Sequence, residues 1–350
     1  MSLASLHVEG LRCLASADLA LAPHLNVIVG PNGSGKTSLL EAIFLAGRGR
    51  SFRTRHTEQL ISRRSDHLLV FAQTEAPFHR IGFEYRRNES YTARLDGQDV
   101  QTLAQLPTAF FVEVIDPDVH RLIEGGPGER RRWLDWGVFH VEHGFLDHWV
   151  RYTRALRQRN AALKLGQDPR IWDGELITQG LQVAALRSAW FDSVRPFWEK
   201  AVERLCGLPV DMANFRGWAA DRELAEVMAA NLERDRERGT TQSGPHRADI
   251  VLRIGGKPAR ETLSRGQQKL VAASMVLALL QRLRSSQLTP PTLLLDDPAA
   301  ELDHERLGHL VDLVKELDCQ IVMTSLEPEP RLFGLPERVF HVEQGRVQGL

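Results

Sequence analysis

The chain has 350 residues, of which 43% are hydrophobic and 25% are charged, and its formal net charge is −1 at pH 7. These fractions are those of an ordinary globular protein, and the length allows one or two domains. A near-neutral charge excludes a surface that is basic overall, so any contact with nucleic acid must come from local patches.

No segment predicts a membrane span or a signal peptide. The longest apolar run, residues 270–280, is too short to cross a bilayer. Residues 1–11 have no basic region followed by an apolar stretch. The three cysteines, Cys13, Cys206 and Cys319, are dispersed, which suggests a reducing compartment and no zinc site. We therefore expect a cytoplasmic protein with no membrane partner.

The first elements along the chain predict strands that lead into a phosphate-binding loop. Residues 3–10 and 17–21 alternate like strands, and residues 24–29 form a short β-branched run typical of a buried strand. A glycine-rich loop follows, and residues 37–44 have the apolar spacing of a helix. Strand, glycine-rich loop and helix, in this order, are the context that a P-loop requires.

Residues 30–37, Gly-Pro-Asn-Gly-Ser-Gly-Lys-Thr, match the P-loop pattern G-x-x-x-x-G-K-[ST]. The glycines let backbone N–H groups and the helix N-terminus face the β-phosphate of a nucleotide. We expect Lys36 to contact the β- and γ-phosphates and assist catalysis, and Thr37 to ligate Mg²⁺. The alternative is a glycine-rich turn that binds nothing, which the flanking strand and helix disfavour. The predicted nucleotide-binding residues of the loop are Gly30, Pro31, Asn32, Gly33, Ser34, Gly35, Lys36, Thr37 and Ser38.

The middle of the chain changes from strands to helices. Residues 67–92 predict further strands, residues 119–230 have a helical pattern, and residues 246–252 predict a strand again. No heptad pattern persists, so long coiled-coil arms are not expected. Five tryptophans of the helical stretch are expected to anchor a core or an interface: Trp133, Trp136, Trp149, Trp190 and Trp198.

Three clusters of basic residues are candidates for DNA contacts, although each is more often typical of a solvated helix face than of a binding site. The sequence does not decide which of these arginines contact DNA. The clusters are Arg48, Arg50, Arg53 and Arg55; Arg130, Arg131 and Arg132; and Arg151, Arg154, Arg157, Arg159 and Lys164.

Residues 263–268, Leu-Ser-Arg-Gly-Gln-Gln, resemble the signature motif of ABC-type ATPases, usually LSGGQ. They precede a helical pattern over residues 267–284, for which Ser264 is the predicted N-cap. A helix start beside a glycine can bind an anion, although in isolation the motif would also fit an ordinary capped helix. In the ABC family the signature of one protomer caps the ATP held by the P-loop of another. The resemblance therefore implies an ATP-dependent homodimer, with Ser264, Arg265, Gly266 and Gln267 at the nucleotide.

Residues 292–297 read as an apolar strand that ends in two acids, similar to a Walker B segment. Asp296 is expected to hold Mg²⁺. Asp297 takes the catalytic position where ABC ATPases usually carry Glu, and its shorter side chain suggests slow hydrolysis. Alone, the two acids would also fit a helix cap. Residues 298–303 resemble the D-loop of the family, in which Asp303 would cross the dimer interface.

Residues 320–324 predict another buried strand, and residues 338–347 predict a closing hairpin with its turn at Gly345. The expected fold is α/β: an ABC-type ATPase head, formed by a P-loop core with flanking antiparallel strands, plus an inserted and mainly helical lobe. Residues 1–115 and 285–350 would form the core lobe with the P-loop, Walker B segment and D-loop. Residues 116–284 would form the helical lobe with the signature motif.

Nearly end to end, the chain resembles the RecF family, bacterial recombination-mediator ATPases of the chromosome-maintenance branch of the ABC superfamily. The stretches that carry the resemblance are residues 30–38, 49–53, 128–135, 158–160, 244–249, 264–269 and 296–297. The resemblance implies a protein that binds ATP and Mg²⁺ and dimerises on double-stranded DNA. It further implies action at gapped DNA with RecR and RecO, which helps to load RecA onto single strands, and hydrolysis that releases the DNA.

Two departures from the wider ABC pattern are visible. The strand that predicts the switch ends in Thr324-Ser325, where transporters usually carry His, which again suggests slow hydrolysis. Residues 115–118 differ from the usual Phe-x-Pro-Glu/Asp stretch, so no Q-loop role is assigned to them. Two other classes stay open: a nucleotide-binding subunit of a membrane transporter, and a metabolic P-loop kinase. The wide separation of P-loop and signature disfavours the first, and the signature helix disfavours the second.

Overall fold

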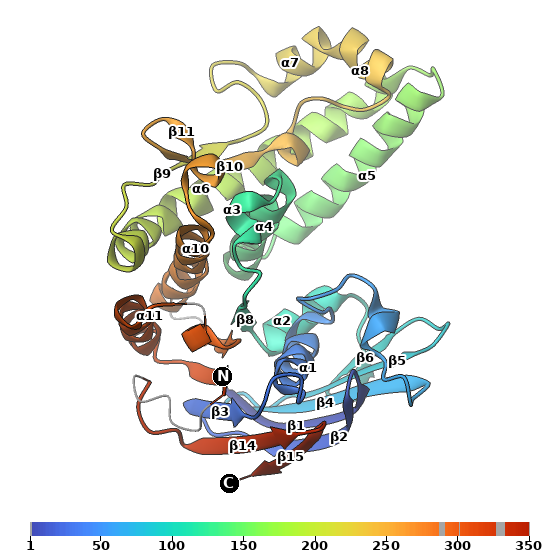
Figure 1. Ribbon diagram of the computed structural model, residues 1–350. Coiled ribbons are helices and arrows are strands. Elements are labelled where there is room, and N and C mark those ends of the chain that lie inside the picture. The colour runs from blue at the N-terminus through green and yellow to red at the C-terminus, as the bar shows by residue number, and fades with distance from the viewer. Residues whose placement is uncertain (1, 287–290, 301, 327–332, 350) are drawn as a thin grey trace. The chain divides into compact units, whose positions relative to one another are not determined.

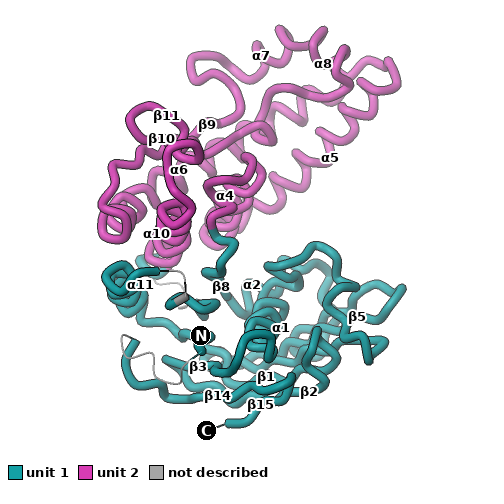
Figure 2. The backbone as a smooth tube through the Cα atoms, viewed as in Figure 1, with its two compact units in different colours: residues 1–119, 284–350 teal, residues 120–283 magenta. Residues whose placement is uncertain are grey.

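The computed structural model describes residues 2–286, 291–300, 302–326 and 333–349. The chain divides into two compact units (Figure 2), and each is described by itself. The first unit comprises residues 1–119 and 284–350, and the second comprises residues 120–283. No helix among the described residues is both long and apolar enough to cross a membrane.

The first unit contains two six-stranded sheets. The first has the order β2-β1-β4-β5-β6-β7, and its strand pairs are antiparallel. Its strands are β1 (Ser2–Leu11), β2 (Leu14–Ala20), β4 (His67–Glu75), β5 (Arg80–Arg86), β6 (Thr92–Leu95) and β7 (Gln98–Asp99). Buried and more exposed residues alternate along β4, as expected for a sheet with one face on the core.

The second sheet has the order β15-β14-β3-β13-β12-β8, in which only the β14–β15 pair is antiparallel. Its strands are β3 (Leu25–Val29), β8 (Val112–Ile115), β12 (Thr292–Leu295), β13 (Gln320–Ser325), β14 (Arg338–Glu343) and β15 (Arg346–Gly349). Every residue of β3, β12 and β13 is buried, as is usual for parallel strands covered on both faces. Because β3, β13 and β12 run parallel, their carboxyl ends lie at one edge of the sheet.

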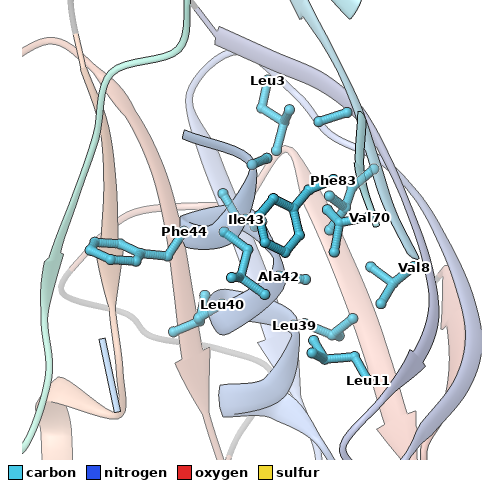
Figure 3. Packing of buried hydrophobic residues seen from close by; sticks show 14 of the residues in the cluster. Leu3, Val8, Leu11, Leu39, Leu40, Ala42, Ile43, Phe44, Val70 and Phe83 are labelled. Atoms are coloured by element: carbon cyan, nitrogen blue, oxygen red, sulfur yellow. The ribbon is translucent and has the colours of Figure 1, made fainter. Parts of the chain in front are cut away.

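Helix α1 (Lys36–Arg48) contacts strands of both sheets and carries much of the core of this unit. Figure 3 shows Leu39 and Ile43 of this helix beside Val8, Val70 and Phe83 of the antiparallel sheet. Almost all of its residues are buried, so α1 fixes the position of the loop before it. The remaining helices of the unit are α2 (Leu106–Ala109), α11 (His304–Glu316), η1 (Thr57–Leu60), η2 (Leu103–Gln105) and η5 (Pro298–Ala300).

The second unit is mainly helical and contains a three-stranded sheet of order β11-β10-β9. Its strands are β9 (Asp211–Phe215), β10 (Asp249–Ile254) and β11 (Lys257–Pro258). Its longer helices, labelled in Figure 1, are α4 (Pro127–Val141), α5 (Phe145–Lys164), α6 (Asp173–Cys206) and α10 (Arg265–Ser285). The last two residues of α10 belong to the first unit. Its shorter helices are α3 (Arg121–Glu124), α7 (Leu224–Ala230), α8 (Leu232–Arg238), α9 (Ala259–Thr262), η3 (Pro169–Trp172) and η4 (Pro245–Arg247).

The structure corrects two of the predicted elements. The helical stretch 119–230 is interrupted by β9, which pairs with β10 from Phe215↔Asp249 to Asp211↔Arg253. The strand predicted over 246–252 begins only at Asp249, because residues 245–247 form the turn η4 with proline at its start. Of the five tryptophans, Trp133, Trp190 and Trp198 are buried in the core of the second unit.

Candidate nucleotide-binding site

The P-loop follows the buried strand β3 and ends where α1 begins. Gly33 has φ 78° and Gly35 has φ 121°, conformations that residues with a Cβ rarely adopt. At Gly30 a Cβ would lie 2.1 Å from the carbonyl oxygen of Val342, a residue of β14. The predicted glycines are therefore required by the backbone path and by close packing against β14. Of the other loop residues, Pro31 and Asn32 are exposed, whereas Ser34, Lys36 and Ser38 are buried.

The side chain of Lys36 folds back over its own loop. Its Nζ donates to the carbonyl oxygens of Gly30, at 2.7 Å, and Pro31, at 3.1 Å. The ammonium therefore lies beside the turn whose N–H groups are expected to bind phosphate. The buried hydroxyl oxygen of Ser34 has no hydrogen-bond partner within the described part of the chain. A buried hydroxyl without a partner is costly, and a phosphate oxygen is a partner that this loop could receive.

Two hydroxyl groups converge on the first acid of the predicted Walker B segment. Thr37 Oγ1 donates to Asp296, at 3.0 Å from Oδ1 and 3.1 Å from Oδ2. From the neighbouring strand, Thr324 Oγ1 donates to Asp296 Oδ1 at 2.8 Å. Adjacent oxygen ligands of an octahedral Mg²⁺ are also roughly 3 Å apart, given metal–oxygen distances near 2.1 Å. The oxygens of Thr37 and Asp296 thus have the spacing of a pair that could share one such ion.

The second acid, Asp297, lies on a turn that is held by the same threonine. Its backbone N–H donates to Thr324 Oγ1 at 2.8 Å, and its φ is 49°. Aspartate tolerates this left-handed conformation better than most residues. The sequence alone does not predict the contacts of the Thr324 hydroxyl, because they depend on β13 lying between β3 and β12. The polar residues at the ends of the predicted parallel strands could have indicated this contact, because the carboxyl ends of parallel strands meet at one edge of the sheet.

The signature motif lies in the second unit, at the start of α10. Ser264 and Gln267 form a capping box, in which Gln267 N–H donates to Ser264 Oγ at 3.3 Å and Ser264 N–H donates to Gln267 Oε1 at 2.9 Å. Ser264, Arg265 and Gly266 are exposed. The buried Gln268 amide donates to the carbonyl oxygens of Arg260 and Leu263 and holds the approach to the helix. The motif is therefore a well-formed helix start on the surface of its unit.

The predicted D-loop lies partly outside the described residues, because Glu301 is not among them. Asp303 is the N-cap of α11, and its carboxylate accepts a hydrogen bond from the backbone N–H of Arg306 at 2.9 Å. Its side chain stays mostly exposed.

The basic clusters separate into buried and exposed residues, which the sequence did not distinguish. Arg48 is buried and ion-paired with Glu113, and burial lowers the pKa of its guanidinium to about 9. Arg130 is ion-paired with Asp249 at 2.8 Å. These two arginines stabilise the fold and are withdrawn as DNA-contact candidates.

In the third cluster, Arg159 is fully buried and is withdrawn for the same reason. Its guanidinium lies 2.7 Å from Asp173 and 2.6 Å from Asp235. A signal was present in the sequence, since Arg159 shares a helical face with Tyr152, Ala155 and Ala162, all of which are buried.

The chain is similar to known proteins over nearly its whole length. The family model described as "RecF/RecN/SMC N terminal domain" matches residues 2–344. A DNA replication and repair protein RecF of Stutzerimonas stutzeri is 39% identical over 362 residues, covering 100% of this chain and 98% of that protein. The corresponding protein of Pseudomonas aeruginosa is also 39% identical, covering 99% and 97%. The chain belongs to the RecF family.

Solved structures confirm the expected fold. The recombination mediator protein RecF-ATP in RecFOR pathway has a TM-score of 0.89 at 24% identity, covering 99% of this chain and 97% of that chain. The Smc head domain bound to the C-terminal domain of ScpA, derived from Pyrococcus furiosus, has a TM-score of 0.61 at 15% identity, covering 99% and 95%. This member of the RecF family therefore has the α/β fold of an ABC-type ATPase head. Its P-loop lies between β3 and α1, its signature motif lies at the start of α10, and its Walker B segment lies at the end of β12.

Proposed function

We propose that the chain is an ATP-dependent DNA clamp of recombinational repair. The observation that carries the proposal is the convergence of Thr37 and Thr324 on Asp296, beside a P-loop whose lysine lies over the loop. Such a site suits a nucleotide triphosphate with its metal ion. The similarity to the RecF-ATP structure, which shares the fold, supports ATP as the nucleotide.

Each residue of the site has a role in this proposal. The P-loop N–H groups and Lys36 bind the β- and γ-phosphates, and Thr37 and Asp296 hold Mg²⁺, which would neutralise phosphate charge. Asp297 orients the attacking water. Its carboxylate is one methylene shorter than the usual glutamate, and Ser325 stands where transporters carry His, so hydrolysis is slow.

Nucleotide binding joins two copies of the chain in this proposal. The exposed Ser264, Arg265 and Gly266 of one copy, with Gln267, cap the ATP on the P-loop of the other. Asp303 of the D-loop lies at the same interface. The dimer closes on double-stranded DNA at gaps and helps RecO and RecR to load RecA onto single strands, and hydrolysis releases it. The bacterial cytoplasm, where the chromosome lies, is the compartment in which it acts.

Light scattering with and without ATP·Mg²⁺ tests the composite site. We expect wild type to shift from the mass of a monomer to that of a dimer, and Ser264→Arg to lose the shift, because the added side chain obstructs the helix start. Ser90→Arg, which adds the same side chain at an exposed serine of the first unit, is the matched control. A wild-type mass that is the same with and without ATP·Mg²⁺ would contradict the clamp mechanism.

A second measurement separates nucleotide binding from dimerisation. Lys36→Met should lose both ATP binding and ATP-dependent retention on duplex DNA, whereas Ser264→Arg should retain ATP binding by each monomer. DNA affinity that does not respond to ATP at moderate salt would contradict the proposal. Salt concentration must be fixed, because phosphate contacts make such binding strongly dependent on it.

A further inference from the structure

The outward face of α5 carries three cations that have no ion-pair partner among the described residues. From Val150 to Lys164 this helix contains no acidic residue. Arg151 pairs with Glu175, and Arg159 is buried among carboxylates. Arg154, Arg157 and Lys164 remain, and all three are exposed. We call these three residues the α5 stripe. No carboxylate of the described residues lies within ion-pair distance of them, since the ion pairs of α5 are those of Arg151 and Arg159.

Exposed arginines elsewhere in this protein are often paired with a nearby carboxylate, unlike the α5 stripe. Examples are Arg86 with Glu84, Arg94 with Asp99, Arg170 with Asp168 and Arg236 with Glu233. Pairs of this kind reduce the local positive potential, so a run of unpaired cations on one helix face leaves a concentrated positive patch.

Packing on the other side of α5 fixes the direction of the stripe. Tyr152 and Arg159 are fully buried on the inward face, and the ion pairs of Arg159 with Asp173 and Asp235 resist rotation of the helix about its axis. The stripe residues share one face of the helix because they are spaced three and seven residues apart. All three are exposed, so this face is the one opposite Tyr152 and Arg159. A firmly seated helix therefore presents the three cations in one direction.

The dimensions of the stripe suit a nucleic-acid backbone. At 1.5 Å per residue, Arg154 and Lys164 are about 15 Å apart along the helix axis. Duplex DNA carries one charge per roughly 1.7 Å of its axis, so several phosphates lie within reach of flexible side chains over that length. Arginine and lysine are the usual phosphate ligands, and they contact the backbone without reading sequence.

We infer that the α5 stripe is a contact surface for the phosphates of double-stranded DNA. The inference rests on the proposed function and deepens it by naming the surface. It predicts that these three residues supply salt-dependent affinity that does not depend on base sequence.

The test compares three triple variants with wild type, in duplex-DNA titrations with ATP·Mg²⁺ over a range of NaCl concentrations. Arg154→Gln/Arg157→Gln/Lys164→Gln removes the stripe. Arg86→Gln/Arg94→Gln/Arg236→Gln removes the same charge from exposed, ion-paired arginines. Arg154→Lys/Arg157→Lys/Lys164→Arg keeps the charge of the stripe.

We expect the first variant to reduce the magnitude of the slope of log K against log salt by about three for each copy of the chain that contacts the DNA. Binding should weaken roughly tenfold per lost contact near 0.1 M salt. The other two should retain the wild-type slope, and all three should keep the ATP-dependent mass shift. An unchanged slope in the first variant overturns the inference, including the case in which the stripe binds an acidic protein instead. Loss of slope in the paired-arginine variant also overturns it. Wild type that fails to bind DNA would instead refute the proposed function.

Discussion

The hydroxyl of Thr324 lies 2.8 Å from Asp296 Oδ1 and ties the two acids of the Walker B segment together. It donates to the Asp296 carboxylate and accepts from the backbone N–H of Asp297 at 2.8 Å. One side chain therefore orients the predicted metal ligand and the turn that bears the predicted catalytic carboxylate. Its strand, β13, lies between the P-loop strand and the Walker B strand.

Thr324→Val removes the hydroxyl while keeping the shape of the side chain. Asp296 loses one of two hydroxyl donors, so we expect a higher Mg²⁺ concentration at half-saturation of ATP binding. Loss of the hydrogen bond from Asp297 N–H to the Thr324 hydroxyl should lower the free energy of unfolding by about 1–3 kcal/mol. Magnesium titrations monitored by a fluorescent ATP analogue, with urea unfolding, measure both. Thr324→Ser restores the hydroxyl and should behave like wild type; equal Mg²⁺ dependence in all three proteins would refute the role.

Asp297→Asn should separate nucleotide binding from hydrolysis. Asparagine tolerates the left-handed backbone at this position, so the fold should persist. The amide cannot accept a proton from water, so phosphate release should fall by about 100-fold or more. The ATP-dependent dimer should last longer, which light scattering over time would show. If phosphate release is unchanged in the variant, Asp297 is not the catalytic base.

Asp297→Glu tests the proposal that the short side chain of Asp297 makes hydrolysis slow. If the short side chain holds its carboxylate too far from the water, the longer side chain should raise the rate of phosphate release. Single-turnover measurement under saturating ATP isolates this step from nucleotide binding. A slower rate in the variant would contradict this explanation and would mean that the turn positions the carboxylate of aspartate better than that of glutamate.

Arg159→Met should destabilise the second unit strongly. It leaves the carboxylate of Asp235, which is 1% exposed, without its cation, and breaking a buried pair in this way typically costs about 3–5 kcal/mol. Arg154→Met, an exposed position on the same helix, should cost far less. Urea unfolding followed by tryptophan fluorescence compares them, and similar losses would contradict the structural role given to Arg159.

The burial of His246 predicts that the free energy of unfolding falls as the pH is lowered from 6.5 to 4. It lies 2.6 Å from the Tyr152 hydroxyl through Nδ1 and 2.9 Å from the Thr241 carbonyl oxygen through Nε2, so Nε2 carries the proton and Nδ1 accepts from Tyr152. Burial lowers the pKa of His246 to about 4 from its ordinary 6.5. Below pH 6.5 the unfolded chain therefore binds a proton that the folded chain does not.

This group contributes stability above pH 6.5 that is lost as the pH falls toward 4, by up to about 3 kcal/mol. Urea unfolding at several pH values, for wild type and His246→Gln, measures it. The variant should show a flatter dependence in this window. Parallel curves for the two proteins would mean that other groups govern the acid response.

The sequence predicted the elements that have strong local signals. The strand β3, the helix α1, the Walker B strand and the closing hairpin occur where their patterns indicated, because each combines regular periodicity with glycine or acidic residues at its ends. Strand β9 was missed since its five residues are specified by pairing with β10, not by their own pattern. The roles of Thr324 and Arg159 depend on which strand or helix lies next to them, and the sequence alone does not give that neighbour.

The packing of β14 against the P-loop has a consequence for synthesis of the protein. Val342 O lies 2.1 Å from the position that a Cβ on Gly30 would take, and Gly345 N–H donates to Ser34 O at 2.9 Å. The loop is made early by the ribosome, but the strand that supports it is made some 300 residues later. At typical elongation rates the loop waits roughly 15 to 60 s for that support. We expect a nascent or prematurely terminated chain that lacks β14 to bind nucleotide poorly at the proposed site, so ATP affinity should distinguish finished molecules from unfinished ones.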